Sequence, residues 1–271
     1  MDIPKVLQIE STARCNAKCS FCPVGVGLKR DVGEMSDTLF DKILVEANDL
    51  GIKTILIFLN GEPFIFSRFF DWLEKLRSYN MVTHVFTNAS LMTKEKTDKL
   101  ISYSDVVDRI CFSVSGKDVE SQRQTMGLPM DRVVENIQYF VSANAGLIKY
   151  WVAMPGLFDR AYRNSWVAFW NSIAGAGKAQ VNPVLNWGGN IESTTKTNQF
   201  KYCSRLYHMT VLWDGRVNLC CMDGHGEVIL GDLNTQTILE VYNGDLARHY
   251  RMKHKFKQQS DLKLCNACNM R

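Results

Sequence analysis

Three cysteines near the beginning of the chain constrain its structure more than any other feature. Cys15, Cys19 and Cys22 are separated by three and two residues and follow an apolar stretch. Four cysteines close a tetrahedral metal site, whereas three leave one position free. On a four-iron cube, three thiolates hold three irons, and the fourth iron stays available to another ligand. The run therefore predicts a metal-binding loop with one free position, and the alternatives are a zinc site or a chance group of thiols.

The composition excludes several classes of protein. With 271 residues, 46% of them hydrophobic, the chain can form one large domain and a small one. It has no apolar run of about 18 residues and no basic-then-apolar export signal at its start. Nine cysteines without such a signal predict a reducing compartment, the cytoplasm, and metal ligation instead of disulfides. The net charge of +4 is small, so we expect neither nucleic-acid nor membrane partners.

The first two-thirds of the chain alternates strand-like with helix-like segments. Each strand–helix step takes about 25 to 30 residues, which is typical of crossover connections in a parallel sheet. The expected strands are 6–11, 54–59, 82–86, 109–114, 149–153 and 180–185, and the expected helices are 38–50, 66–78, 93–101, 131–143 and 161–173. Six strands are too few to close an eight-stranded barrel. The sequence therefore predicts an α/β fold built on a partial (β/α)6 parallel barrel.

The pattern changes after residues 187–189, which read Trp-Gly-Gly. Residues 191–199 are polar and are interpreted as a linker, so we divide the chain into a barrel domain, 1–190, and a small α+β domain, 191–271. In the second domain Asp214-Gly215 separates two strand-like runs, which is a strong hairpin signal. A helix is expected from 238 to about 254. The basic stretch 248–257 is either a solvated face or a patch for an anionic substrate or reductant.

The first cysteine run, with Phe21 directly before its third cysteine, resembles the radical S-adenosylmethionine (SAM) superfamily. In that family the free iron of a [4Fe–4S] cluster chelates SAM, and one electron cleaves SAM into methionine and a 5′-deoxyadenosyl radical. The resemblance implies that Cys15, Cys19 and Cys22 hold this cluster and that Phe21 lies near the adenine. It also implies the partial barrel and a flavodoxin- or ferredoxin-type reductant.

Further motifs at expected strand ends resemble those of the family. Asn60-Gly61-Glu62-Pro63 is similar to its Gly-Gly-Glu-Pro motif, which implies a carboxylate that pairs with the ammonium of SAM. Thr87-Asn88 is similar to Thr-Asn-Gly. Ser113 and Ser115 stand in a segment similar to Ser-Ile-Asp-Gly, with Ser115 where Asp is usual, and Arg123 is a candidate clamp for the SAM carboxylate. The implied SAM-binding set is Phe21, Asn60, Gly61, Glu62, Thr87, Asn88, Ser113, Ser115 and Arg123.

The later cysteines resemble the auxiliary-cluster module of the family, the twitch form of the SPASM domain. By motif, the ligands of a second [4Fe–4S] cluster are Cys203, Cys220, Cys265 and Cys268. A zinc ribbon with the same thiolates remains an alternative on spacing. Cys221 is then surplus: it is structural, a ligand in place of Cys220, or a free thiol beside the active site, and it is our candidate catalytic residue. Cys111, in the middle of an expected strand, is predicted to be a small buried side chain.

The resemblance implies abstraction of a hydrogen atom from an unactivated C–H bond, with the difficult chemistry carried by the cofactors. We expect oxidation of a secondary alcohol on a cyclitol or sugar, with one electron passed to the auxiliary cluster. Candidate bases are Arg163, Arg205, His208 and His225. The alternatives are an epimerase of a sugar or peptide, with Cys221 as hydrogen donor, a peptide maturase, and a non-catalytic iron–sulfur or zinc protein.

Overall fold

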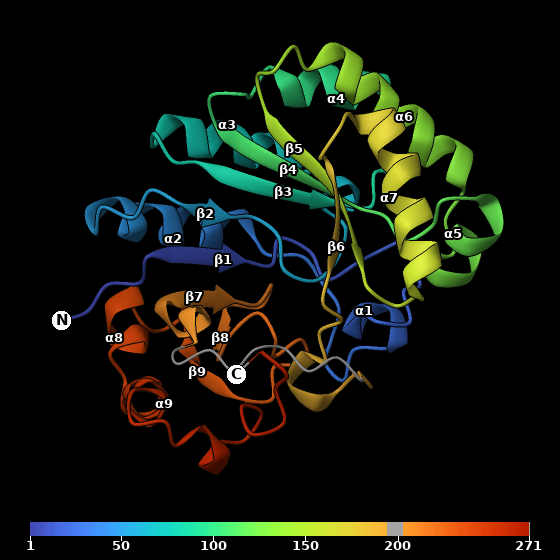
Figure 1. The fold of residues 1–271 in the computed structure, drawn as a ribbon. Coiled ribbons are helices and arrows are strands. Elements are labelled where there is room, and N and C mark those ends of the chain that lie inside the picture. Colours follow the sequence, from blue (N-terminus) through green and yellow to red (C-terminus); the bar gives the residue numbers. More distant parts are fainter. Residues whose placement is uncertain (194–202, 271) are drawn as a thin grey trace.

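The computed structural model describes residues 1–193 and 203–270. Its amino-terminal part contains six parallel strands (Figure 1). A bridge between Thr54 and Val82 joins the two groups that they form, so the strands follow one another in chain order, as predicted. The strands are β1 (Val6–Ile9), β2 (Ile55–Leu56), β3 (Thr83–Thr87), β4 (Val107–Ser113), β5 (Lys149–Pro155) and β6 (Ala179–Asn182).

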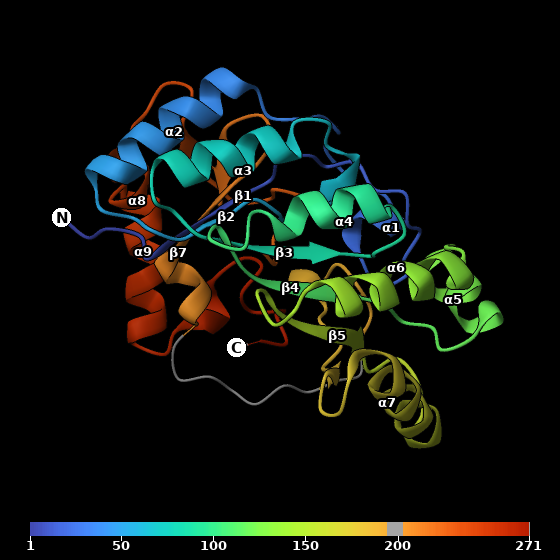
Figure 2. The ribbon, with the colours of Figure 1, turned by 90° about the horizontal axis from the view of Figure 1, so that it is seen from above.

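Helices cover the outer face of these strands (Figure 2). They are α2 (Asp37–Asp49), α3 (Phe69–Ser78), α4 (Lys94–Ile101), α6 (Met130–Ala143) and α7 (Arg160–Ala174). Ser36 caps α2 by accepting a hydrogen bond from the backbone amide of Leu39, which would otherwise lack a partner at the helix start. The rings of Phe40 and Trp72 stack with centroids 3.6 Å apart and join α2 to α3. Each helix thus buries an apolar stripe.

Local side-chain hydrogen bonds shorten one predicted strand. Only Ile55–Leu56 of the expected strand 54–59 belongs to the sheet. The carbonyl of Ile57 accepts a hydrogen bond from the Ser11 hydroxyl at 3.1 Å, and the amide of Ile57 donates to the Thr83 hydroxyl at 3.4 Å. Because side chains take these backbone groups, the ladder with β1 does not continue.

Two short helices and one helix break were not predicted. α1 (Pro23–Val26) follows the third cysteine, and α5 (Val119–Met126) follows β4. Few residues of α5 are apolar, so its helical periodicity is weak. The predicted helix 238–254 is two helices, α8 (Ile238–Tyr242) and α9 (Asp245–Lys255). Gly244 adopts an extended conformation at the start of α9, which ends the first helix.

The carboxyl-terminal part extends the same sheet. β7 (His208–Val211) pairs in parallel with β1, β8 (Arg216–Asn218) pairs antiparallel with β7, and β9 (Ile229–Asp232) pairs antiparallel with β8. The predicted hairpin at Asp214-Gly215 is confirmed. The sheet crosses the predicted domain boundary near residue 190, and that boundary stays a prediction. Residues 194–199 of the predicted linker lie outside the described residues. Within the described part, no helix combines the length and apolar character that a membrane span needs.

Candidate functional site

A cavity of about 560 Å³ lies inside the barrel. Alternate residues of a strand point to opposite faces, so every second side chain faces inward. The lining includes Val6 and Gln8 of β1, His84 and Phe86 of β3, and Cys111 and Ser113 of β4. The carboxyl-terminal part contributes Arg205, His208, Cys221 and Met222 to the same lining. Both parts of the chain therefore enclose one space.

The first cysteine run forms a loop after β1 that lines this cavity. Cys15, Cys19 and Cys22 lie in one small apolar cluster with Met126 and Leu128. Burial raises the pKa of Cys15 to about 11, and it also raises the pKa of Cys19 and Cys22. The bare thiols are therefore protonated at neutral pH, whereas a bound metal selects the thiolate. Three sulfurs at a cavity wall fit a cluster that presents one free iron to the cavity.

Two glycines let the backbone approach the cysteine loop. Gly61 has a φ of +88°, and a Cβ there would overlap the carbonyl oxygen of Thr12 and lie 2.8 Å from that of Arg14. A Cβ on Gly25, in α1, would overlap the backbone of Cys19. Neither position accepts a side chain without movement of the loop. Gly61 belongs to the predicted set, whereas Gly25 was missed, because a single glycine near a proline gives no signal of close approach.

Glu62 is the centre of a buried hydrogen-bonded group at the strand ends. It is 2% exposed and accepts hydrogen bonds from the Thr87 hydroxyl at 2.7 Å and from the backbone amides of Asn88 at 2.8 Å and Phe64 at 3.2 Å. Burial raises the pKa of Glu62 to about 7, although the hydrogen bonds act in the opposite direction. The side chain of Asn88 donates to Asn16 at 3.0 Å, which ties the group to the cysteine loop. A positive group in the cavity would favour the carboxylate.

Ser113, Ser115 and Phe21 also line the cavity. The hydroxyl of Ser115 is buried and has no hydrogen-bond partner within the described residues. Buried hydroxyls without partners are uncommon in folded proteins, so this one fits a ligand that enters the cavity. The carbonyl oxygen of Phe21 accepts a hydrogen bond from Trp187 Nε1 at 3.0 Å. This bond connects the cysteine loop to the segment after β6.

Two predicted residues do not line the cavity. Asn60 is buried and donates to Glu10 Oε1 at 3.0 Å, in a network that also contains Arg30. Arg123, on α5, is exposed and pairs with Glu120 at 2.9 Å. The structure therefore does not bring Arg123 together with the other candidates, because α5 turns this side chain toward solvent.

The second cysteine set also gathers in one place. Cys220, Cys221 and Cys265 are buried in a second apolar cluster, and Cys203 packs against it. Burial raises the pKa of Cys203 and of Cys221, and the nearby Cys268 adds to the rise at both. Of these five cysteines, Cys221 lines the cavity and the other four do not. The four predicted ligands are thus neighbours, with the surplus thiol on their cavity side.

Residues 1–193 and 203–270 contain no group of three Cys, His, Asp or Glu side chains arranged around a single metal ion. A cube differs from a single ion because each of its irons takes its own thiolate. The two cysteine sets fit that larger group by their burial, their sulfur chemistry and their mutual proximity.

Two of the four candidate bases line the cavity, namely Arg205 and His208. The Nδ1 atom of His208 is buried and, within the described residues, has no hydrogen-bond partner. Burial lowers the pKa of His208, and the charge of Arg205 lowers it further, so the imidazole is neutral at pH 7. His225 instead accepts a hydrogen bond from the amide of Lys29 at 3.2 Å. Neither His225 nor Arg163 is part of the cavity lining.

Sequence reasoning missed the polar residues inside the barrel. Gln8 and His84 line the cavity from strands that are otherwise apolar, and Thr54 does so next to β2. The available signal is a polar residue at the inward-facing position of a buried strand. Cys111 is 2% exposed, which confirms the predicted buried side chain, but it also lines the cavity. Burial raises its pKa to about 12.

Fold and site together define an α/β-barrel protein with two cysteine sets suited to metal clusters around one cavity. Comparison with known proteins specifies the family. Residues 9–163 match the radical SAM superfamily, and residues 203–269 match the SPASM iron–sulfur cluster-binding domain. The chain belongs to the radical SAM superfamily and is a radical SAM enzyme. The first match implies a [4Fe–4S] cluster and SAM, and the second implies auxiliary iron–sulfur clusters.

The curated relatives match different parts of the chain, from about half of it to almost all of it. The S-adenosyl-L-methionine-dependent 2-deoxy-scyllo-inosamine dehydrogenase of Niallia circulans is 22% identical over 97% of this chain and 92% of its own length. The cofactor-modifying protein of the tungsten-containing aldehyde ferredoxin oxidoreductase of Pyrococcus furiosus is 30% identical over 45% of this chain and 34% of its own length. The PqqA peptide cyclase of Bradyrhizobium diazoefficiens is 24% identical over 51% of this chain and 40% of its own length.

A solved structure matches over almost the whole chain. The crystal structure of BtrN in complex with AdoMet and 2-DOIA has a TM-score of 0.70 and covers 99% of this chain and 94% of that one, with 17% identity. At this identity the likeness shows a common fold. The predicted partial barrel with its small auxiliary α+β part is confirmed.

Proposed function

We propose that the chain abstracts a hydrogen atom from a cyclitol or sugar in the barrel cavity and oxidises its secondary alcohol to a ketone. When bound, the first cluster and SAM supply a 5′-deoxyadenosyl radical that takes the hydrogen, and the auxiliary cluster supplies an acceptor for the electron that the substrate then loses. The observation that carries the proposal is that Cys22 and Cys221, from the two cysteine sets, line the same cavity. The dehydrogenase relative that matches 97% of the chain supports the choice of reaction.

The amino-terminal part, 1–190, is proposed to bind the first cluster and SAM. Cys15, Cys19 and Cys22 hold the cluster at the cavity wall. The carboxylate of Glu62 pairs with the ammonium of SAM, because its three hydrogen bonds fix it beside the cavity. The unpartnered hydroxyl of Ser115 gives a further contact. The remaining proposed SAM-binding residues of the cavity lining are Phe21, Gly61, Thr87, Asn88 and Ser113.

The carboxyl-terminal part, 191–271, is proposed to bind the auxiliary cluster through Cys203, Cys220, Cys265 and Cys268. Cys203, Cys220 and Cys265 belong to one apolar cluster, and Cys268 lies near Cys203, which supports this set. The same part supplies a proton acceptor. His208 lines the cavity and is neutral at pH 7, and its Nδ1 atom has no hydrogen-bond partner among the described residues. We propose that this atom takes the hydroxyl proton as the ketone forms.

Isotope transfer tests the oxidation. The reconstituted protein is given SAM, a reductant and a panel of cyclitols and sugars that carry deuterium at each carbinol carbon. We expect one of them to yield a ketone while its deuterium appears in 5′-deoxyadenosine. His208→Gln should slow ketone formation by about 100-fold at saturating substrate, whereas Arg163→Gln, outside the lining, should not. Deuterium that stays in the recovered substrate would contradict the proposal.

Epimerisation is the second candidate, and one observation favours it. Cys221 lines the cavity, and burial raises the pKa of its thiol, so it keeps its hydrogen at neutral pH. A protonated thiol beside a substrate radical can return a hydrogen atom from the opposite face. This reaction applies to a sugar or to a residue of a peptide.

Cys221→Ala separates the two candidates. In an oxidation, the variant should form ketone at close to the wild-type rate. In an epimerisation run in deuterated water, the wild type should place one deuterium in the product, and the variant should lose product while it still cleaves SAM. Cys111→Ala is the matched control, because it also removes a buried thiol from the cavity wall.

A further inference from the structure

Helix α9 and the two residues after it carry a charge equal to the net charge of the whole chain. Residues 245–257 contain five Lys or Arg residues and one Asp, which gives +4, and the complete chain also has a net charge of +4. The other residues are therefore balanced in charge. Such a separation of charge produces a field that steers charged partners toward one place on the surface.

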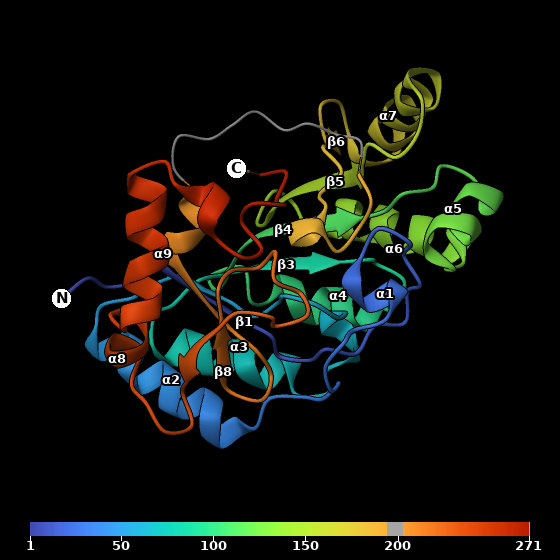
Figure 3. The ribbon, with the colours of Figure 1, turned by 90° about the horizontal axis from the view of Figure 1, so that it is seen from below.

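The basic residues share their face of α9 with exposed apolar side chains. The helix lies along the outer edge of the molecule (Figure 3) and buries Ala247, Tyr250 and His254. Its exposed side and the residues just after it present Leu246, Arg248, Met252, Lys255, Phe256 and Lys257. Phe256 is 59% exposed and Met252 is 49% exposed. Exposed Met and aromatic side chains grouped with basic ones are typical of a binding surface.

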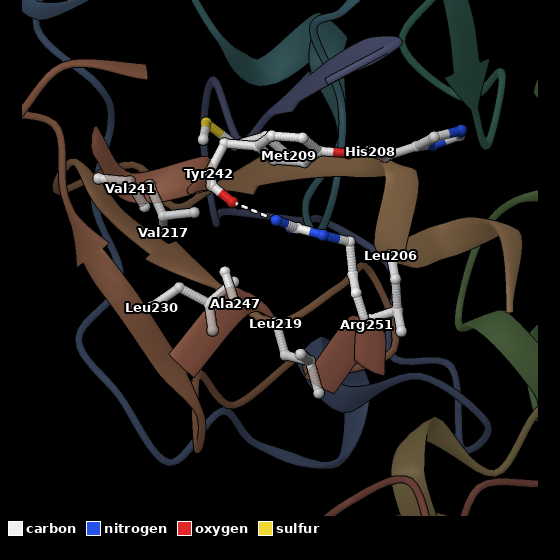
Figure 4. Close-up of a pocket in the computed structure, with 10 residues that line it drawn as sticks. All are labelled: Leu206, His208, Met209, Val217, Leu219, Leu230, Val241, Tyr242, Ala247 and Arg251. Atoms are coloured by element: carbon white, nitrogen blue, oxygen red, sulfur yellow. Dashed lines mark hydrogen bonds between the residues drawn. The ribbon is translucent and has the colours of Figure 1, made fainter. Parts of the chain in front are cut away.

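Two other basic residues of the helix are engaged within the chain. Arg251 donates to the carbonyl of Tyr242 at 2.7 Å and covers its ring, which ties α9 to α8 (Figure 4). Lys253 pairs with Asp261 at 2.9 Å. For Arg248, Lys255 and Lys257, the described part of the chain supplies no carboxylate within ion-pair distance. These three charges are available to a partner.

The buried face of α9 contacts the second cysteine set. Tyr250 lies in the same apolar cluster as Cys220 and Cys265. An α-helix with its side chains is about 10–12 Å across. A partner on the outer face therefore sits about one helix diameter from the cysteines.

We propose that this face of α9 binds an acidic one-electron carrier protein that removes the electron left by each turnover. The inference rests on the proposed oxidation, in which the CH–OH group of a secondary alcohol becomes the C=O group of a ketone. The C–H hydrogen atom goes to the SAM-derived carbon, the hydroxyl proton goes to the base, and one electron remains. The carrier, a flavin or iron–sulfur protein, is reduced by that electron. We choose an electron carrier as the partner because α9 packs against the cysteines that would hold the electron.

Direct binding tests the surface. The probe is a purified flavodoxin of net negative charge, titrated into the reconstituted protein at about 20 and about 200 mM salt, with affinity from flavin fluorescence. We expect binding that weakens with salt. The triple variant R248E/K255E/K257E should bind about tenfold more weakly, and M252S/F256S should also bind more weakly. The control R132E/R160E reverses exposed charges on α6 and α7 and should bind like the wild type.

A second set of measurements keeps this proposal separate from the proposed function. Dithionite-driven 5′-deoxyadenosine formation needs no carrier, so it should be the same in the triple variant and the wild type. If the wild type forms none, the proposed function fails while the binding result stands. The surface proposal fails if the triple variant binds flavodoxin as tightly as the control. It also fails if the three charges govern binding to phosphatidylglycerol vesicles and not to flavodoxin, since a basic, partly apolar helix also suits anionic lipid.

Discussion

At the scale of single residues, the protonation of Glu62 gives the most informative test of the SAM side. Its pKa rises from 4.5 to about 7 because the side chain is buried. Between these values the folded protein binds a proton that the unfolded chain has lost, so in the absence of SAM stability falls as pH rises through this window. The ammonium of SAM would offset this cost, because an opposite charge favours the carboxylate.

SAM affinity is therefore expected to depend on pH. In the wild type it should increase between about pH 6 and about pH 8, as Glu62 ionises. Glu62→Gln should weaken binding about tenfold at pH 8 and give a flat profile, because the charge-assisted hydrogen bond is lost. Anaerobic calorimetry with the reconstituted protein measures the SAM affinity of the wild type and of the variant at each pH. Glu120→Gln, on the exposed face of α5, is the control. An affinity that still rises with pH in the Glu62→Gln variant would contradict the assigned role.

The sequence predicts strand-end residues well and helix-borne residues poorly. Glu62 and Thr87 were expected at neighbouring strand ends, and they are joined by a hydrogen bond of 2.7 Å. The carboxyl ends of parallel strands meet at one edge, so motif and strand order suffice there. The prediction for Arg123 depended on the direction in which a short polar helix turns this side chain. Its sequence has too few apolar residues to fix that direction.

At the scale of elements, the cysteine loop depends on the close contact between α1 and its own preceding turn. Gly25 lies so near the backbone of Cys19 that any Cβ would overlap it. The loop has no strand pairing between its cysteines, so it is held by this contact, by its few buried side chains and by single hydrogen bonds such as that from Asn88 to Asn16. A change at Gly25 therefore acts on the geometry of the cysteines and not on the barrel.

Gly25→Ala is expected to impair the first cluster alone. After anaerobic reconstitution, iron and sulfide should fall by about half, because one cluster of two is lost. The signal of the auxiliary cluster in electron paramagnetic resonance should persist. Val26→Ala is the matched control, since Val26 is on the same helix and 52% exposed. Equal iron content and equal SAM cleavage in the two variants would show that the contact is dispensable.

Element boundaries deviated from prediction where side chains or glycine compete with regular structure. Strand β2 is short because Ser11 and Thr83 take the backbone groups of Ile57. The break between α8 and α9 lies at Gly244. Apolar periodicity continues across both places, and it does not record which hydrogen bonds the backbone makes.

At the scale of the whole molecule, a buried ion pair joins the two parts of the chain. Glu10 and Arg30 pair at 2.5 Å, and their side chains are 0% and 4% exposed. Glu10 also accepts from the backbone amide of Trp213 at 3.2 Å, and Arg30 donates to the carbonyl of Gly224 at 3.0 Å. The pair thus holds the carboxyl-terminal part against the barrel, where the shared cavity is enclosed.

Removing one member of this pair should destabilise the protein strongly. Arg30→Met leaves the carboxylate of Glu10 buried without its partner and is expected to lower the free energy of unfolding by about 3–5 kcal/mol. Urea denaturation followed by circular dichroism measures the change. The double variant E10L/R30M should recover much of the loss, because no unpaired charge remains. Arg123→Met breaks an exposed pair and should have no measurable effect. Equal stability of R30M and R123M would refute the bridging role.

The strand–helix alternation was sufficient to predict the barrel, but not how the second part attaches to it. The pairing of β7 with β1 joins residues about 200 positions apart, and no local pattern encodes it. The shared cavity follows from that pairing. For this reason Arg205 and His208 were candidates on chemistry alone, and only the fold separates them from Arg163 and His225.

The most direct measurement of the central claim is the yield of 5′-deoxyadenosine from SAM and reductant, taken together with iron and sulfide content. The wild type should carry about eight irons in two clusters and form 5′-deoxyadenosine. Cys19→Ala should lose both the first cluster and the product, whereas Cys111→Ala should keep both. Zinc in the first cysteine set, or two intact clusters that never cleave SAM, would contradict the account.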